Sequence, residues 1–230
     1  MSRDKALGAF RLFFAALGFV GLTAQYLYNA SVIPNYKPLN FFSFFTVEAN
    51  IIAIVSLLVS GIFILRGGHP KWVEYLRGAA TIYMTITGIT YSLLLSNQEV
   101  DVSIPWVNLV LHYIIPIVMI IDWLIDLPPF RISLKQALIW LIFPVLYLVY
   151  SLVRGPSADF YPYPFLDPGI SGYGTVIVMS IAIAIGAPAR LAPILDHHPP
   201  PPVRQKSGVA EQPFGRPATS PSRCRHLRTP

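Results

Sequence analysis

The stretch from Trp106 to Leu127, WVNLVLHYIIPIVMIIDWLIDL, is a long run of mostly apolar side chains. As an α-helix it measures about 33 Å, which is enough to cross the roughly 30 Å hydrocarbon core of a bilayer. Apart from Tyr113, only His112, Asp122 and Asp126 are ionisable within it. This composition predicts a membrane-spanning helix.

Five further stretches have similar composition, and together the six predict an all-α integral membrane domain with six transmembrane helices. The other five run approximately from Gly8 to Tyr28, Ser43 to Leu65, Tyr75 to Leu95, Gln136 to Val153 and Gly172 to Ala189. The chain has 54% hydrophobic and 12% charged residues, about half the charged share of a soluble domain. A soluble helical bundle would need polar faces at helical spacing, and four of the six stretches lack them.

The basic residues indicate the orientation of these helices. With the N-terminus inside, fifteen of the seventeen Lys and Arg residues fall on the cytoplasmic side, and only Lys37 and Arg154 fall outside. Lys and Arg concentrate in cytoplasmic loops of membrane proteins. We therefore expect a multi-pass protein of the cell membrane with both termini in the cytoplasm. The first stretch has a basic start but no small-residue cleavage motif after it, so we expect a retained helix.

Residues 191–230 differ from the preceding chain. They contain the run Pro199–Pro202 and few large apolar residues, so they cannot bury enough surface to fold alone. The sequence predicts a transmembrane domain at 1–190 and a disordered, proline-rich basic cytoplasmic tail at 191–230. A second interpretation is contact with anionic lipid headgroups, for which the tail offers Arg216, Arg223, Arg225 and Arg228. Most of the net charge of +6 lies in this tail and the inner loops, so nucleic-acid binding is not expected.

The supply of ligands argues against a metal or cofactor protein. The single Cys224 excludes an intrachain disulfide and a cysteine-based metal cluster. His112 is the only histidine inside a predicted span, whereas a bis-histidine haem needs two and a diiron centre needs clustered carboxylates or histidines. His197 and His198 beside the prolines are expected to be solvated. We therefore expect no cofactor and no metal.

Polar residues inside the predicted spans are functional candidates, because burying them in hydrocarbon is costly. Ser43, Thr46 and Asn50 are spaced three and four apart and would share a helix face, and Asn108 and His112 are four apart on another span. Thr46 and His112 would lie roughly 5 and 9 Å below the outer interface. A hydroxyl and an imidazole at similar depth are the minimum parts of a nucleophile and its general base.

Structural interpretations compete with this one. Ser and Thr are common in membrane helices as packing residues, and a backbone carbonyl can orient an imidazole as well as the Asn108 side chain can. In the third span we expect a small-residue packing stripe, formed by Thr81, Thr85, Gly88 and Ser92. Charged residues are expected to pair: Glu48 with Arg154, and Asp122 and Asp126 with Arg11, Arg131 or Lys135.

Three segments resemble landmarks of the androgen-induced membrane hydrolase family and its bacterial six-helix relatives. They are Asn40–Asn50 (NFFSFFTVEAN), Trp106–Asp126 (WVNLVLHYIIPIVMIIDWLID) and Phe160–Gly174 (FYPYPFLDPGISGYG). With the helix layout, the resemblance covers about residues 8 to 190. Well-characterised members of that family are intramembrane hydrolases of fatty acid esters of hydroxy fatty acids, with a threonine nucleophile and a histidine on another helix.

The resemblance implies His112 as the base, because an Asn, a His and a Pro recur at Asn108, His112 and Pro116. Matching the threonine implies Thr46 as the nucleophile, whereas an ungapped alignment through Asn50 implies Ser43. Both alternatives stay open. The resemblance also implies a mouth of the site formed by Tyr163 and Phe165, with Asp167 nearby.

Two function classes are compatible with these features. The first is an intramembrane lipid ester hydrolase, for which membrane lipids are partners and a lipid ester is the substrate. The alternative is a non-catalytic transporter or channel-like protein, which would need paired acidic and basic groups along a path through several helices. The sequence offers only scattered ones, so the hydrolase is the preferred interpretation.

The first prediction tests the orientation. Single cysteines at Lys37, Ser103 and Asp159 should react with a membrane-impermeant reagent from outside intact cells, because these loops are assigned to the outer side. Cysteines at Lys71 and Arg131 should react only after the membrane is opened. Labelling of the Lys71 position from outside would show that the orientation is wrong.

Overall fold

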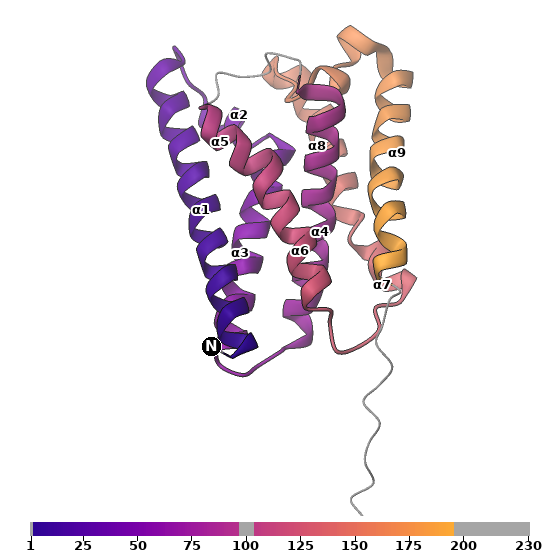
Figure 1. Ribbon diagram of the computed structural model, residues 1–230. Helices are drawn as coiled ribbons and strands as arrows, with labels where there is room; N and C mark the ends of the chain where they lie inside the picture. The colour runs from indigo at the N-terminus through magenta and orange to yellow at the C-terminus, as the bar shows by residue number, and fades with distance from the viewer. Residues whose placement is uncertain (1, 97–103, 196–230) are drawn as a thin grey trace, which may run out of the picture. The chain divides into compact units, whose positions relative to one another are not determined.

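The computed structural model describes residues 2–96 and 104–195, and this part of the chain forms helices and no strands. The α-helices are α1 (Arg3–Val32), α2 (Pro38–Phe41), α3 (Phe45–Leu65), α4 (Lys71–Thr90), α5 (Pro105–Leu109), α6 (Ile115–Ile125), α7 (Leu134–Ile139), α8 (Ile142–Ala158) and α9 (Pro168–Leu195). Two π-helices, η1 (Tyr91–Leu95) and η2 (Val110–Ile114), and one 3-10 helix, η3 (Pro164–Leu166), complete them. The longer helices lie side by side (Figure 1).

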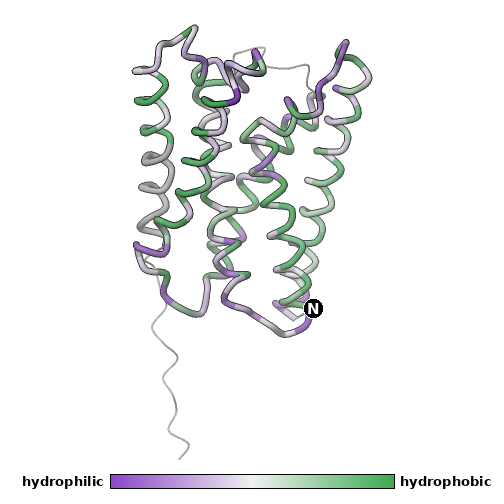
Figure 2. The backbone as a smooth tube through the Cα atoms, turned by 180° about the vertical axis from the view of Figure 1, so that it is seen from behind, coloured by the Kyte–Doolittle hydropathy of each residue, from purple (hydrophilic) through white to green (hydrophobic). Residues whose placement is uncertain are grey.

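The prediction of apolar, membrane-compatible helices is confirmed for five segments. Those long and apolar enough to cross a membrane are Arg3–Val32, Phe45–Leu65, Lys71–Leu95, Pro105–Ile125 and Lys135–Ala158. The sixth predicted span coincides with α9, whose described apolar part, Pro168–Ile183, is shorter. Hydrophobic residues follow the helices, and hydrophilic ones gather toward their ends (Figure 2). Ser103 and the tail from residue 196, including His197, His198 and Cys224, lie outside the described residues.

Two local boundaries differ from the sequence prediction. The second span begins at Phe45 rather than Ser43, so Ser43 precedes the helix and does not share a helical face with Thr46. The fifth span is interrupted at Trp140 and Leu141, between α7 and α8. The indole of Trp140 packs in a T-shaped contact against Trp123 of α6. Trp140 is therefore buried, although it lies at the break between the two helices.

The small-residue stripe of α4 packs as expected. A Cβ atom on Gly88 would lie 3.1 Å from Cβ of Pro116, so α4 and α6 approach closely at this level. Three hydroxyls on the stripe bond to carbonyls one turn earlier in the same helix: Thr81 to Arg77, Thr85 to Thr81 and Ser92 to Gly88. Each hydroxyl therefore has an acceptor within one turn, and Thr81 also donates to the carbonyl of Met119 in α6 at 3.4 Å.

Charged side chains from three helices meet near the end at which the N-terminus lies. Arg11 of α1 donates to Asp122 of α6 at 2.6 Å and to Asp126 at 2.7 Å. Arg77 of α4 donates to the Asp122 carboxylate at 2.8 and 3.0 Å, and it also bonds Glu74. Arg11, Arg77 and Asp122 are each only 1% exposed, and ions buried to this degree need such pairing to offset their desolvation.

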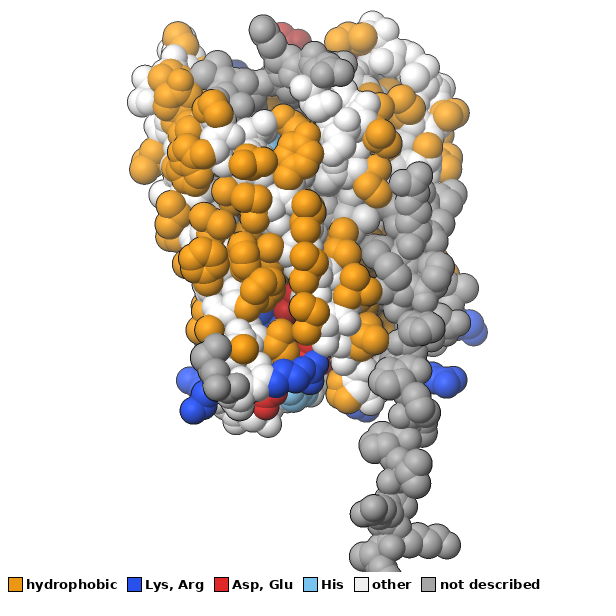
Figure 3. All heavy atoms as spheres, viewed as in Figure 1, with side chains coloured by type: hydrophobic (Ala, Val, Ile, Leu, Met, Phe, Trp, Pro, Cys, Tyr) orange, Lys and Arg blue, Asp and Glu red, His pale blue; other side chains and the backbone are white. Residues whose placement is uncertain are grey.

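The network also decides between the expected partners. Arg11 pairs with both aspartates as predicted, and the exposed Arg3 adds a contact to Asp126 at 3.2 Å. Of the three alternative partners that the sequence offered, the structure selects Arg11; among the described ion pairs, the two aspartates bond neither Arg131 nor Lys135. Figure 3 shows charged side chains at this end and hydrophobic ones over the middle of the visible face.

The expected Glu48–Arg154 pair is also wrong. Arg154 instead donates to Oδ1 of Asn40 at 2.6 Å and lies over the ring of Phe160. This contact joins α8 to the short helix α2.

The second prediction concerns the buried network. Arg11→Met removes the guanidinium but keeps an apolar stem, so Asp122 and Asp126 each lose a close partner in a buried setting. We expect a loss of about 3–5 kcal/mol in the free energy of unfolding. Thermal unfolding of the purified protein in detergent measures it.

Arg3→Met is the matched control, because Arg3 contacts the same Asp126 but its side chain is 64% exposed. We expect a change below about 1 kcal/mol for this variant. Equal melting temperatures for the two variants would contradict the assignment of the network as a major stabilising contact.

Candidate functional site

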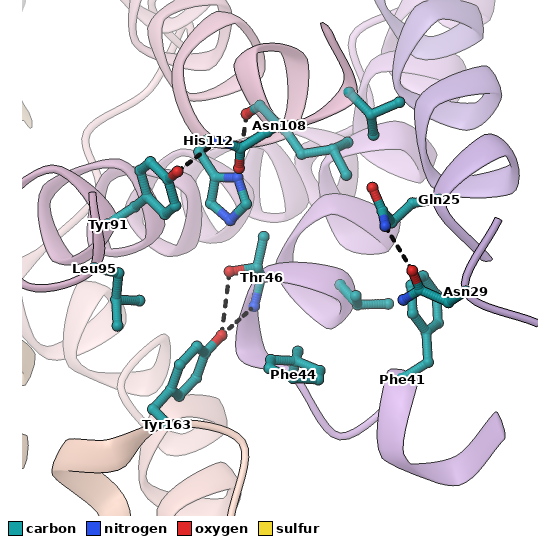
Figure 4. Close-up of a pocket in the computed structure, with 13 residues that line it drawn as sticks. Gln25, Asn29, Phe41, Phe44, Thr46, Tyr91, Leu95, Asn108, His112 and Tyr163 are labelled. Carbon is teal, nitrogen blue, oxygen red and sulfur yellow. Dashed lines mark hydrogen bonds between the residues drawn. The ribbon is translucent and has the colours of Figure 1, made fainter. Parts of the chain in front are cut away.

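A cavity of about 110 Å³ brings together most of the predicted site residues. Thr46 from α3, Asn108 from α5 and His112 from η2 all line it, and Tyr163 closes one side. In Figure 4 the imidazole of His112 points from one wall toward Thr46 on the other. The two side chains form no direct hydrogen bond with each other.

Thr46 lies in the first turn of α3, where backbone N–H groups have no acceptor within the helix. The hydroxyl of Tyr163 accepts from the N–H of Thr46 at 3.1 Å and lies 3.1 Å from Thr46 Oγ1. The hydroxyl of Tyr147 accepts from the N–H of Phe45 at 3.2 Å. Two tyrosines from distant parts of the chain therefore cap α3, whose own N-cap residue, Phe44, makes no side-chain cap.

Tyr163 is a neutral hydrogen-bonding group at this position. Burial raises the pKa of Tyr163 to about 12, so its hydroxyl stays protonated at neutral pH. Because the oxygen already accepts from a backbone N–H, its proton is free to be donated to Thr46 Oγ1. The ring is fixed by an edge contact with Phe44 and a stacked contact with Phe165.

His112 is held in one orientation by two contacts. Its Nδ1 lies 3.1 Å from the backbone carbonyl of Asn108, and a carbonyl can only accept, so Nδ1 carries the proton. In the neutral ring this leaves Nε2 as the free base nitrogen. The ring stacks on Tyr91 with centroids 3.9 Å apart, and the side chain of Asn108 donates to the Tyr91 hydroxyl rather than to the imidazole.

The π-helix that carries His112 has a cause in the sequence. Pro116 has no N–H to donate to the preceding turn. The N–H of Ile115 bonds to the carbonyl of Val110, five residues back, instead of to that of Leu111. The Leu111 carbonyl is therefore left without its α-helical donor, and π-helical turns of this kind are frequent at functional sites.

Asn50 uses that free carbonyl. Its Nδ2 donates to the Leu111 carbonyl at 3.2 Å and to the Thr46 carbonyl at 2.8 Å. One fully buried amide thus joins the turn that bears Thr46 to the residue next to His112. The relative position of the two candidate catalytic groups depends on this bridge.

Ser43, the alternative nucleophile, lies elsewhere. It is fully buried, and its hydroxyl bonds the carbonyl of Leu39 and lies 3.0 Å from the hydroxyl of Tyr150. It does not line the cavity that contains His112. The geometry therefore associates Thr46, and not Ser43, with the imidazole.

A larger recess of about 570 Å³ adjoins the site. It is lined mainly by the loop that follows α1 and by residues between 158 and 170. It shares Asn29, Phe41, Phe44 and Tyr163 with the cavity that contains Thr46 and His112. Of these shared residues, Tyr163 bonds Thr46 directly. The carboxylate of Asp167 accepts from the N–H of Gly169 at 2.8 Å, and Asp167 lines the larger recess but not the cavity that contains Thr46.

Several lining residues were not predicted from the sequence. Gln25 and Asn29 of α1 both line the cavity and bond each other at 2.7 Å, and Tyr91 supports His112. Gln25 and Asn29 are polar residues four apart in an apolar span, which is the signal used for Asn108 and His112. Tyr91 offered no such signal, because its role depends on the packing of η1 against η2.

Comparison of this chain with protein-family models, with curated proteins and with solved structures finds no match.

The third prediction tests the cap on α3. Tyr163→Phe should leave the buried N–H of Thr46 without its acceptor and cost about 1–3 kcal/mol in the free energy of unfolding. Tyr161→Phe, in the same loop, is the control, because the hydroxyl of Tyr161 bonds no described residue. Denaturation in detergent compares the two, and an equal effect of both would show that the Tyr163 hydroxyl does not cap the helix.

Proposed function

We propose that this protein is an intramembrane lipid ester hydrolase in which Thr46 is the nucleophile and His112 the general base. One observation carries the proposal: Thr46 and His112 line the same small cavity. The bond between Nδ1 of His112 and the Asn108 carbonyl fixes the ring and leaves Nε2 unprotonated. A hydroxyl, a base and a group that orients the base are the parts that acyl transfer requires.

The reaction would follow the chemistry of other hydroxyl nucleophiles. Thr46 Oγ1 attacks the ester carbonyl carbon while Nε2 of His112 takes its proton. The proton passes to the departing alcohol oxygen as the C–O bond breaks, which leaves an acyl group on Thr46. Water then attacks the acyl carbon, His112 takes the water proton and returns it to Thr46, and the carboxylic acid leaves.

Tyr163 is the donor best suited to the oxyanion of this reaction. Its neutral hydroxyl lies 3.1 Å from the nucleophilic oxygen, so a small shift would bring its proton to the carbonyl oxygen of a bound ester. The N–H of Thr46 now bonds the same hydroxyl, and it becomes a second donor if Tyr163 turns toward the substrate.

The membrane setting suits a lipid substrate. We propose six spans in the cell membrane, with both termini in the cytoplasm and the site near the outer leaflet, where an ester group of a lipid would lie. The resemblance to the androgen-induced membrane hydrolase family points to the same class of substrate.

A transporter or channel is the second class, and the buried charges speak against it. A charged path would need ionic groups at several depths. The buried ion pairs of the described residues instead join α1, α4 and α6 at one end, where every carboxylate already has an arginine.

The fourth prediction tests the two catalytic roles. In purified protein, Thr46→Val and His112→Gln should each lower hydrolysis of lipid esters by at least about 10²-fold. Both should also abolish labelling by a fluorophosphonate probe, because the covalent adduct needs the hydroxyl and the base. Thr46→Ser should keep measurable labelling, since it restores a hydroxyl at the same position.

Ser43→Ala is the matched control, and it should label like the parent protein, because its hydroxyl faces Leu39 and Tyr150. Melting temperatures of all variants separate loss of chemistry from loss of folding. If the parent protein hydrolyses none of a panel of lipid esters and takes up no probe, the hydrolase assignment is wrong. Loss of labelling in Ser43→Ala alone would reassign the nucleophile.

A further inference from the structure

A second cavity, of about 160 Å³, adjoins the candidate site on the side of α4 and α9. Its wall is mostly apolar and includes Phe45, Ile86, Leu148 and Leu166. It shares Thr46, Tyr91, Leu95 and Tyr163 with the first cavity. A chain attached to an acyl group on Thr46 could therefore extend into it.

Three hydroxyls on the wall of this apolar cavity have unsatisfied hydrogen-bonding capacity. The oxygens of Thr87 and Thr90 on α4 and of Ser180 on α9 are buried, and none bonds to a residue within the described ranges. Thr87 is only 3% exposed. A buried hydroxyl without a partner is costly, and native structures normally supply one.

The contrast with the rest of α4 shows that this is a local feature. Thr81 and Thr85 on the same helix bond the carbonyl one turn earlier. Thr87 and Thr90 form no such bond, and both face the cavity. Three residues with unpaired hydroxyls, from two helices, thus line one apolar cavity, which points to a ligand that carries a polar atom.

We infer that this cavity binds the apolar chain of the substrate and that the three hydroxyls recognise an oxygen carried on that chain, such as a ketone or hydroxyl group. An unsubstituted chain would leave all three hydroxyls unpaired after expelling water, whereas a ketone oxygen at their level could accept from up to two of them and a hydroxyl group could in addition donate. The inference rests on the proposed function for the attachment at Thr46. The cavity and its hydroxyls are independent of that chemistry.

The experiment compares chains that differ by one oxygen. Purified full-length protein is assayed with 4-nitrophenyl octanoate and with oxo-octanoate esters that carry a ketone at carbon 5, 6 or 7. At least one oxo ester should be hydrolysed with a kcat/KM about five-fold higher than the plain ester, the size expected for one net hydrogen bond. The double variant Thr87→Val, Thr90→Val has nearly the same shape without the hydroxyls, and it should lose this preference, measured as the ratio of kcat/KM for the oxo ester to kcat/KM for the plain ester.

Thr85→Val is the matched control on the same helix, because its hydroxyl bonds Thr81 and does not line the cavity. Its preference should equal that of the parent protein. Hydrolysis with no preference for any oxo chain, or a preference that survives in the double variant, overturns the inference and leaves the proposed function standing.

A binding readout separates the two proposals if hydrolysis is absent. Octanamide and its oxo counterparts cannot be turned over readily, and the shift in melting temperature reports their binding. A larger shift with an oxo amide that is lost in the double variant Thr87→Val, Thr90→Val would support the assignment of the cavity as a chain-binding site. Only the hydrolase assignment would then be wrong. Equal shifts for all amides would refute the cavity assignment itself.

Discussion

The site depends on the side-chain amide of Asn50. It donates to the carbonyl of Thr46 in its own helix and to the carbonyl of Leu111 across the interface, so it fixes α3 against η2. The second acceptor exists only because Pro116 and the π-helical turn leave the Leu111 carbonyl free. A distortion of one helix thus creates the contact that sets the distance between Thr46 and His112.

Polar groups are used differently at the two ends of the helices. Near the N-terminal end of α1, arginines and carboxylates are paired closely in the buried network of Arg11, Arg77 and Asp122. Around the site, the wall of the cavity consists of neutral polar groups and apolar side chains. The charged network holds α1, α4 and α6 together. The residues that line the cavity include no Asp, Glu, Lys or Arg, so the cavity contains no ionic group that would need a partner.

Much of the fold could be predicted from the sequence, because the length and composition of an apolar stretch almost determine a helix in a membrane. The association of Thr46 with His112 also followed from their depths along two helices. The cap by Tyr163, the stacking of Tyr91 on His112 and the position of Ser43 could not be predicted. Each depends on where a helix begins or how two elements pack, and these details vary by one or two residues without changing the hydrophobic pattern.

A neutral cavity sets a requirement for any acyl transfer within it. Moving the proton of Thr46 to His112 separates charge where the surrounding dielectric is low, so fixed dipoles must replace the solvent. The first turn of α3 directs the positive end of the helix dipole at Thr46, where an oxyanion would form. The Asn108 carbonyl directs its negative end at Nδ1 of His112, where the positive charge would be shared. Both dipoles are aligned before a substrate arrives, because Asn50 and the π-helical turn hold the two helices that carry them.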